Sequence, residues 1–329
     1  MEHPYLMYLG DVPDQLGAKT AKGIVDWRPE WCLGQVRLAD CKADLGIQDI
    51  SIAEAAKNGA KTMVIGIVNS GGFLPEHWVR DIIEAMEAGM DIASGLHIRL
   101  GSISEVKEAA ERLGRNLFDV RHPTQDLPTG KGTPRSGKRL LAVGTDCSVG
   151  KMYTALAVEK EMKKRGMKAD FRATGQTGIF IAGTGISIDA VVADFISGAV
   201  EVLSPANDED HWDIIEGQGS LFHPSFAGVS LGLLHGSQAD ALILCHEPTR
   251  THMRGLPHQP LPDLKECMEL NLTTARLTNK DAKFVGVSVN TSGLSVAEGD
   301  ALLKKLEDEL GLPCVDAFRT GVAPIIDNL

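Results

Sequence analysis

The chain has 329 residues, 43% of them hydrophobic and 23% charged, which excludes a disordered protein and favours two domains with substantial cores. A formal net charge of −11 argues against nucleic acid as a partner, because phosphate binding calls for a basic patch. No apolar run reaches the ~18 residues that cross a bilayer, and the start MEHPYLMYLGD lacks the order of a secretory signal, so we expect a cytoplasmic protein that binds no membrane.

The first half of the chain alternates short apolar runs with helical patterns, which is typical of a parallel sheet covered by helices. The predicted strands are Leu6–Leu9, Gly34–Leu38, Thr62–Val68, Asp91–Ser94 and Asn116–Val120. The predicted helices are Ile52–Asn58, Pro75–Glu87 and Ser104–Leu113. We therefore predict a Rossmann-like N-terminal domain over residues 1–125.

Two polar turns follow strands of this domain. Asn69, Ser70 and Gly71 precede a predicted helix, and Ser94 and His97 follow the next strand. We predict that these residues bind a substrate carboxylate, although ordinary strand-to-helix turns would look the same. The glycines after the first strand do not form a GxGxxG, which argues against a dinucleotide site.

Residues 126–138 crowd Pro, Gly and polar side chains without apolar periodicity, so we predict a linker there. Strand and helix patterns then alternate again, which predicts a P-loop NTPase-like, doubly wound domain over residues 139–329. Its predicted strands are Arg139–Val143, Lys168–Arg172, Asp213–Ile215, Ala241–Cys245, Lys283–Val289 and Cys314–Phe318.

The run LLAVGTDCSVGKMYT carries the strongest functional signal, because an apolar strand, a glycine-bounded loop and a lysine arrive in order before a helical pattern. Main-chain N–H groups and a helix N-terminus in such a loop face an anion, and the lysine adds a positive charge. We predict that the loop binds the diphosphate of a nucleotide or a nucleotide-containing ligand. The predicted ligand-binding residues are Gly144, Thr145, Asp146, Cys147, Ser148, Val149, Gly150, Lys151 and Met152.

This loop departs from the common phosphate loop at two points. Five residues separate Gly144 from Gly150, a spacing that resembles the loops of dethiobiotin synthetase. Met152 stands where a Ser or Thr normally holds Mg²⁺, and Thr154 lies too far along the helix to replace it. We therefore expect a ligand that is bound without being hydrolysed, and no metal. The thiol of Cys147, near a helix N-terminus, could accept an acyl group or only shape the loop.

Further polar residues follow neighbouring strands, whose carboxyl ends meet at one edge of a parallel sheet. In ATGQTGIFIAGTG we expect Gln176 and Thr177 to lie in a glycine-rich loop that borders the ligand. In DIIEGQGSLFHPSF a strand ends at Glu216, which we predict to be catalytic as a general base, although a metal ligand or a loop-capping carboxylate is an alternative. His223 is a second candidate for acid–base catalysis, and Gln218 is a candidate substrate ligand.

The run CHEPTR ends a later strand. His246 is a third catalytic candidate that could stabilise an oxyanion, and the guanidinium of Arg250 could clamp a carboxylate or a phosphate. The nearby His252 and Arg254 could equally belong to a solvated loop.

The Rossmann-like first domain, the loop GTDCSVGKMYT and the segments EGQGSLFHPSF and LCHEPTR resemble, over essentially the whole chain, a family long labelled as a domain of unknown function. That family includes bacterial D-glutamate N-acetyltransferases, which act beside a partner enzyme in D-glutamate breakdown. The resemblance implies acetyl-CoA as donor and D-glutamate as acceptor. The loop would then hold the diphosphate of coenzyme A, Glu216 or His223 would deprotonate the substrate ammonium, and Arg250 with the turn at Asn69 would bind its carboxylates.

Two other interpretations stay open at this point. The same loop and Glu216 suit an ATP-dependent ligase or kinase of the dethiobiotin synthetase type, which would need Mg-ATP. A nucleotide-sensing regulator would bind its ligand and consume nothing. In every case small molecules are the expected partners, and a homo-oligomer is the default assembly.

Overall fold

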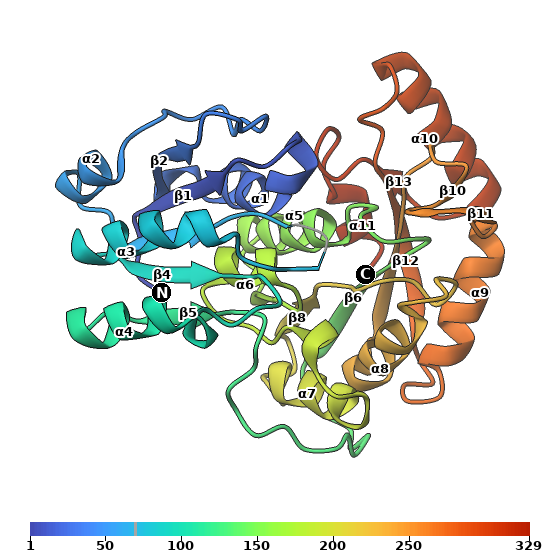
Figure 1. Cartoon of the computed structure of the whole chain (residues 1–329). Helices are drawn as coiled ribbons and strands as arrows, with labels where there is room; N and C mark the ends of the chain where they lie inside the picture. Colours follow the sequence, from blue (N-terminus) through green and yellow to red (C-terminus); the bar gives the residue numbers. More distant parts are fainter. Residues whose placement is uncertain (69–70) are drawn as a thin grey trace. The chain divides into compact units, whose positions relative to one another are not determined.

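The first half of the chain builds a parallel sheet in the strand order β2-β1-β3-β4-β5 (Figure 1). The computed structural model describes residues 1–68 and 71–329. β1 pairs with both β2 and β3, and its run YLMYLG is buried at every residue, as expected for a strand covered on both faces. The elements are β1 Tyr5–Gly10, α1 Lys19–Trp27, β2 Cys32–Arg37, α2 Ile52–Lys57, β3 Thr62–Ile65, α3 Val79–Glu87, β4 Asp91–Ser94, α4 Ser104–Leu113 and β5 Leu117–Asp119.

The second half builds a six-stranded parallel sheet in the order β13-β12-β9-β6-β8-β7. β6 lies between β8 and β9, and its run KRLLAVG is buried at every residue except Lys138. The elements are β6 Lys138–Gly144, α5 Lys151–Lys164, β7 Ala169–Arg172, α6 Gln176–Ala182, α7 Ile196–Leu203, β8 Trp212–Ile215, α8 Ala227–Ser237, β9 Ala241–His246, β10 His252–Met253, β11 Leu256–Pro260, α9 Leu264–Ala275, β12 Lys283–Val289, α10 Val296–Leu310, β13 Cys314–Val315 and α11 Ala323–Asp327.

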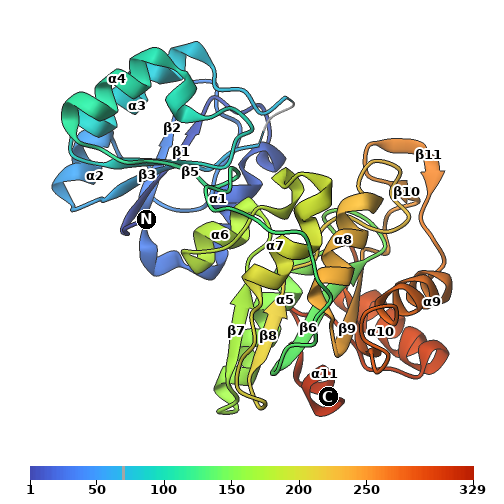
Figure 2. The ribbon, with the colours of Figure 1, turned by 90° about the horizontal axis from the view of Figure 1, so that it is seen from below.

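The chain divides into two compact units, each with its own sheet. The first comprises Met1–Thr124 with Ile179–Ser187, and the second Gln125–Gly178 with Ile188–Leu329. Figure 2 shows α3 and α4 side by side on one face of the first sheet. In the second unit α7 packs along α8, where a Cβ on Gly232 would lie 2.5 Å from Ile196 Cγ2, so glycine lets the two helices approach closely.

The predicted α/β class is confirmed, since both sheets are parallel and their strands alternate with helices. The bounds of β4, α4 and β12 coincide with their predictions. The largest errors in strand length concern the predicted strands Thr62–Val68 and Cys314–Phe318, which extend well past the observed ends. β3 ends at Ile65 because the chain turns away from the sheet, so that the carbonyl of Gly66 accepts a hydrogen bond from the N–H of Ala21 at 2.8 Å. β13 ends at Val315.

The prediction of a loop at Gln176 and Thr177 is wrong, because both residues begin helix α6. The antiparallel pair β10–β11 was not predicted at all. No helix within residues 1–68 and 71–329 is long and apolar enough to cross a membrane.

Candidate active site at the phosphate loop

The order of the strands brings three predicted site residues to one edge of the second sheet. Gly144 ends β6 and pairs with Cys245 of β9, so His246 follows directly beside it. Leu141 of β6 pairs with Ile215, the last residue of β8, and Glu216 comes next. β6 is the strand where the chain order of the sheet reverses, which is where open α/β sheets bind their ligands.

The loop between β6 and α5 has the backbone of an anion-binding turn. Ser148 adopts a φ of +53° and Gly150 a φ of +99°, which lets the chain curl before the helix begins. Within the described residues, the main-chain N–H groups of Ser148, Val149 and Gly150 have no hydrogen-bond acceptor. These donors, together with the first turn of α5, are available to an anion.

Lys151 places its ammonium inside this loop. The side chain is buried, and Nζ donates a hydrogen bond to the carbonyl of Asp146 at 2.7 Å. Burial lowers the pKa of this ammonium. A phosphate near Nζ would oppose that shift, because an opposite charge favours the charged form of lysine. Lys151 is thus placed as the phosphate loop requires.

Asp146 organises the loop from within. Its carboxylate is fully buried; Oδ1 accepts the N–H of Cys147 at 2.6 Å, and Oδ2 accepts Nη1 of Arg250 at 2.9 Å and the N–H of Arg254 at 2.8 Å. Arg250 also donates to the carbonyls of Cys147 and Ser148, both at 2.7 Å. Through these contacts the Arg250 guanidinium holds the loop in place. Its predicted binding of a substrate carboxylate or phosphate stays a prediction.

Glu216 is a buried carboxylate beside the loop. Its Oε2 accepts hydrogen bonds from the main-chain N–H groups of Thr174 at 2.9 Å and Gly175 at 3.1 Å. Glu216 therefore has the loop-capping role given above as an alternative, and the residues it caps directly precede α6. Burial raises its pKa to about 7, the charge of Asp189 adds to that shift, and the two N–H groups and Lys151 oppose it. A pKa near neutrality suits a general base.

The second oxygen of Glu216, Oε1, accepts no hydrogen bond from the residues that the structure describes. One oxygen therefore anchors the side chain while the other can take a proton. The carboxylate fits because two neighbouring residues are glycines. A Cβ on Gly178 would lie 2.4 Å from Oε2, and a Cβ on Gly175 would lie 3.3 Å from Oε1.

Gln218 belongs to the same segment. Its amide Nε2 donates to Thr174 Oγ1 at 3.0 Å, and Thr174 Oγ1 in turn donates to the carbonyl of Glu216 at 2.7 Å. Gln218 thus braces the Glu216 segment, and its predicted contact with substrate stays a prediction. Thr174 was missed in the sequence, where only its position before a glycine could have drawn attention to it.

The two predicted catalytic histidines have different surroundings. His223 is buried and its Nδ1 accepts the N–H of Ser225 at 3.1 Å, so the proton of the neutral ring lies on Nε2. In that form Nε2 donates but cannot take a proton, which favours Glu216 as the base. His246 Nδ1 lies 3.1 Å from Thr145 Oγ1, in a hydrogen bond, and burial lowers the pKa of the ring.

Asp146, Cys147 and His223 each bring one potential metal-ligand atom within 4.8 Å of the others. Both Asp146 oxygens already accept hydrogen bonds, one of them from the Arg250 guanidinium, so a cation would compete with a positive side chain. Thr154 gives no help as a magnesium ligand, because its hydroxyl is buried and donates to Ser288 Oγ at 2.8 Å. The groups around Asp146, Cys147 and His223 therefore suit a bound anion better than a metal ion.

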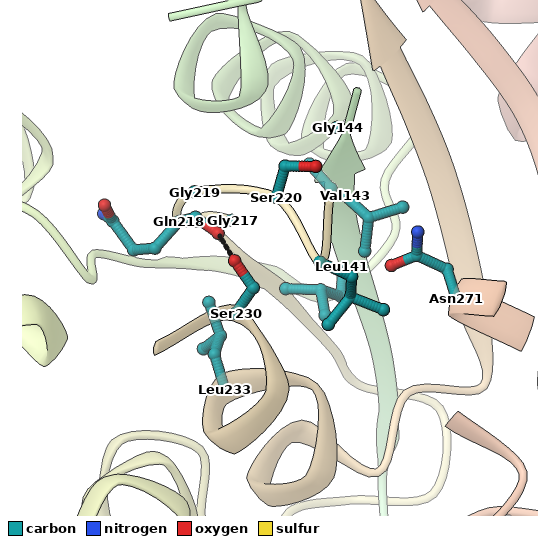
Figure 3. A pocket seen from close by; sticks show the side chains of 12 residues that line it. Leu141, Val143, Gly144, Gly217, Gln218, Gly219, Ser220, Ser230, Leu233 and Asn271 are labelled. Carbon is teal, nitrogen blue, oxygen red and sulfur yellow. Dashed lines mark hydrogen bonds between the residues drawn. The ribbon is translucent and has the colours of Figure 1, made fainter. Parts of the chain in front are cut away.

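A small cavity lies between the end of β6 and the glycines that follow β8 (Figure 3). Its volume of about 10 Å³ is room for roughly one water, so it holds no cosubstrate. Ser230 borders it and donates to the carbonyl of Gln218 at 2.8 Å, the dashed contact in Figure 3.

Gly217 lets the segment that follows β8 pack closely against β6, the strand that leads into the phosphate loop. A Cβ at this position would lie 1.6 Å from the carbonyl oxygen of Ala142, a main-chain atom that cannot move aside. We expect Gly217→Ala to lower the melting temperature by on the order of 10 °C, whatever the effect on activity. Gly228→Ala is the matched control, because a Cβ there meets nothing within 4 Å. Equal melting temperatures for the two variants would contradict this packing.

The predicted substrate residues of the first unit are described by themselves. Asn69 and Ser70 lie outside the described residues. Gly71 precedes Gly72, whose carbonyl accepts the N–H of Ile98 at 3.0 Å, and a Cβ on Gly72 would lie 2.4 Å from the ring of His97. Ser94 is buried, and its hydroxyl accepts the N–H of Leu96 at 3.1 Å. The two polar turns are therefore neighbours, and substrate binding by them stays a prediction.

Both units are similar to known proteins. Family models described as domains of unknown function match residues 36–123 (DUF1611_N, Rossmann-like domain) and residues 128–326 (DUF1611_C, P-loop domain). Curated relatives named D-glutamate N-acetyltransferase are 54% identical to this chain. One from Tritonibacter scottomollicae covers 100% of this chain and 99% of its own length, and one from Pseudoalteromonas sp covers 99% and 98%. The crystal structure of a DUF1611 family protein from Anabaena variabilis is 31% identical, with a TM-score of 0.87 over 98% of this chain and 97% of its own.

Proposed function

We propose, because this chain belongs to the DUF1611 family, that it is an N-acetyltransferase which moves the acetyl group of acetyl-CoA to the amino group of D-glutamate. The names of the two relatives support the reaction and the acceptor. The phosphate loop supports the donor, because coenzyme A carries a diphosphate. One observation carries the proposal: a phosphate loop without a magnesium hydroxyl stands beside a buried carboxylate whose pKa is about 7.

The residues of the loop suit a diphosphate that is held and not cleaved. The unpaired N–H groups of Ser148, Val149 and Gly150 would donate hydrogen bonds to its oxygens, and the Lys151 ammonium would neutralise charge. Met152 offers no oxygen to Mg²⁺, and acetyl transfer needs none. Hydrolysis of a nucleoside triphosphate, in contrast, depends on that ion.

Glu216 would supply the base. Oε1 takes a proton from the substrate ammonium, and the freed amine attacks the thioester carbonyl. An amide bond forms as the carbon–sulfur bond breaks. Of the two protons that the nitrogen loses, one passes to the leaving thiolate and the other is released to solvent. His246, or the Nε2–H of His223, would stabilise the oxyanion. Because Glu216 neighbours the loop, this scheme requires the pantetheine arm to fold back over the loop.

Thiol release from acetyl-CoA, measured against a panel of D- and L-amino acids, tests the proposal. We expect release with D-glutamate and little with the L-enantiomer, without added magnesium. ADP formation from Mg-ATP would favour the ligase or kinase alternative, and binding of acetyl-CoA without turnover would favour a sensor. We further propose that the enzyme acts in the cytoplasm on small molecules alone, as a homo-oligomer in D-glutamate breakdown; light scattering tests the assembly.

A further inference from the structure

Arg254 brings an uncompensated positive charge to the rim of the phosphate loop. Its Nη1 donates to the hydroxyl of Ser148, and within the described residues the guanidinium has no carboxylate partner. The neighbouring Arg250 differs, because it pairs with Asp146 and with Glu247, both at 2.9 Å. Of the two guanidiniums beside the loop, that of Arg254 is the one left to neutralise a ligand.

Arg250 approaches the loop from its carbonyl side, whereas Arg254 contacts the side chain of Ser148. Arg250 binds the carbonyls of Cys147 and Ser148. In a trans peptide the C=O and N–H point in opposite directions, so these carbonyls face away from the N–H groups of Ser148 and Val149. A diphosphate on the N–H groups would use the main chain of the loop, and the Arg254 guanidinium, which is bonded to the Ser148 side chain, could then bind a different anionic group.

The donor in the proposed function carries such a group. Besides its diphosphate, coenzyme A has a phosphate monoester on the ribose, and a monoester bears between one and two negative charges at neutral pH. A planar guanidinium binds phosphate oxygens through two parallel hydrogen bonds, which a single ammonium cannot do.

We propose that Arg254 binds the ribose phosphate of coenzyme A and thereby makes the enzyme select acetyl-CoA over acetyl-3′-dephospho-CoA. The inference rests on the proposed function and adds the residue that sets donor specificity. The β10–β11 pair, Met253 with Leu256, supports the turn that contains Arg254, and the main-chain N–H of Arg254 is fixed by Asp146.

Steady-state kinetics with the two donors test this role. For the wild type we expect a KM that is on the order of tenfold lower for acetyl-CoA than for the dephospho form. Arg254→Gln should raise the KM for acetyl-CoA by a similar factor with little change in kcat, and should leave the dephospho donor near its wild-type KM. Lys305→Gln, which removes an exposed charge on α10, is the control and should change neither.

Arg254→Lys keeps the positive charge but loses the two parallel hydrogen bonds of a guanidinium, so it should recover part of the preference for acetyl-CoA over the dephospho donor. Both variants keep the main-chain hydrogen bond to Asp146. Equal increases in KM for both donors would overturn the inference, because Arg254 would then contact the diphosphate. A wild type that turns over both donors alike would overturn it while leaving acetyl transfer intact. A wild type that acetylates D-glutamate from neither donor would instead overturn the proposed function, and this inference with it.

Discussion

Replacement of Glu216 by Gln is expected to lower kcat by a factor of about 10² to 10⁴ while leaving the KM for acetyl-CoA close to that of the wild type. Glutamine has the same shape and still accepts the N–H groups of Thr174 and Gly175, but it cannot take a proton. Glu201→Gln is the matched control, since that carboxylate also accepts main-chain N–H groups, those of Lys131 and Gly132. An unchanged kcat in Glu216→Gln would remove this carboxylate from the chemistry.

The pKa of Glu216 also predicts how stability depends on pH. Burial raises the folded-state pKa from an ordinary 4.5 to about 7, so the folded protein binds a proton more tightly than the unfolded chain. The resulting stabilisation is complete below about pH 4.5 and is lost as the pH rises through about 7, a change of about 3 kcal/mol. The free energy of unfolding of Glu216→Gln should lack this part of the pH dependence, which a comparison of urea midpoints at pH 5 and pH 8 would show. Parallel curves for the variant and the wild type would contradict the raised pKa.

The pH dependence of kcat/KM should follow the ionisation of the same carboxyl group, that of Glu216. Because the base must be ionised, wild-type kcat/KM should rise with pH and reach half of its plateau near pH 7.

Lys151→Met is expected to raise the KM for acetyl-CoA by a factor of about 10 to 100, because a buried hydrogen bond to a charged group contributes about 1.5–3 kcal/mol. The same variant should use S-acetylpantetheine, which lacks the nucleotide, about as well as the wild type does. Lys160→Met removes an exposed charge from the same helix and serves as control. A loss that is equal for both donors would place Lys151 in the chemistry instead of in the binding of the nucleotide.

Much of the fold follows from local pattern. Continuous apolar runs such as KFVGVSV predict buried parallel strands, and β12 has the predicted bounds. The order strand, glycine loop and lysine likewise predicts the phosphate loop, because backbone geometry and charge both reside in consecutive residues.

The features that the sequence did not predict depend on contacts between residues far apart in the chain. Helix α6 replaces the predicted loop where the Glu216 carboxylate, some forty residues later, accepts the N–H groups of Thr174 and Gly175. Arg250 was predicted to face a substrate, and nothing in CHEPTR reveals that Asp146 takes its guanidinium. The pKa of Glu216 results from burial, which no local pattern states.

A crystal structure of the complex with acetyl-CoA tests whether the loop from Gly144 to Lys151 holds the diphosphate of this donor. We predict diphosphate oxygens within hydrogen-bond distance of the N–H groups of Ser148, Val149 and Gly150, with Lys151 Nζ turned from the Asp146 carbonyl to a phosphate. Acetyl-CoA bound elsewhere, with Lys151 still on that carbonyl, would contradict this binding mode.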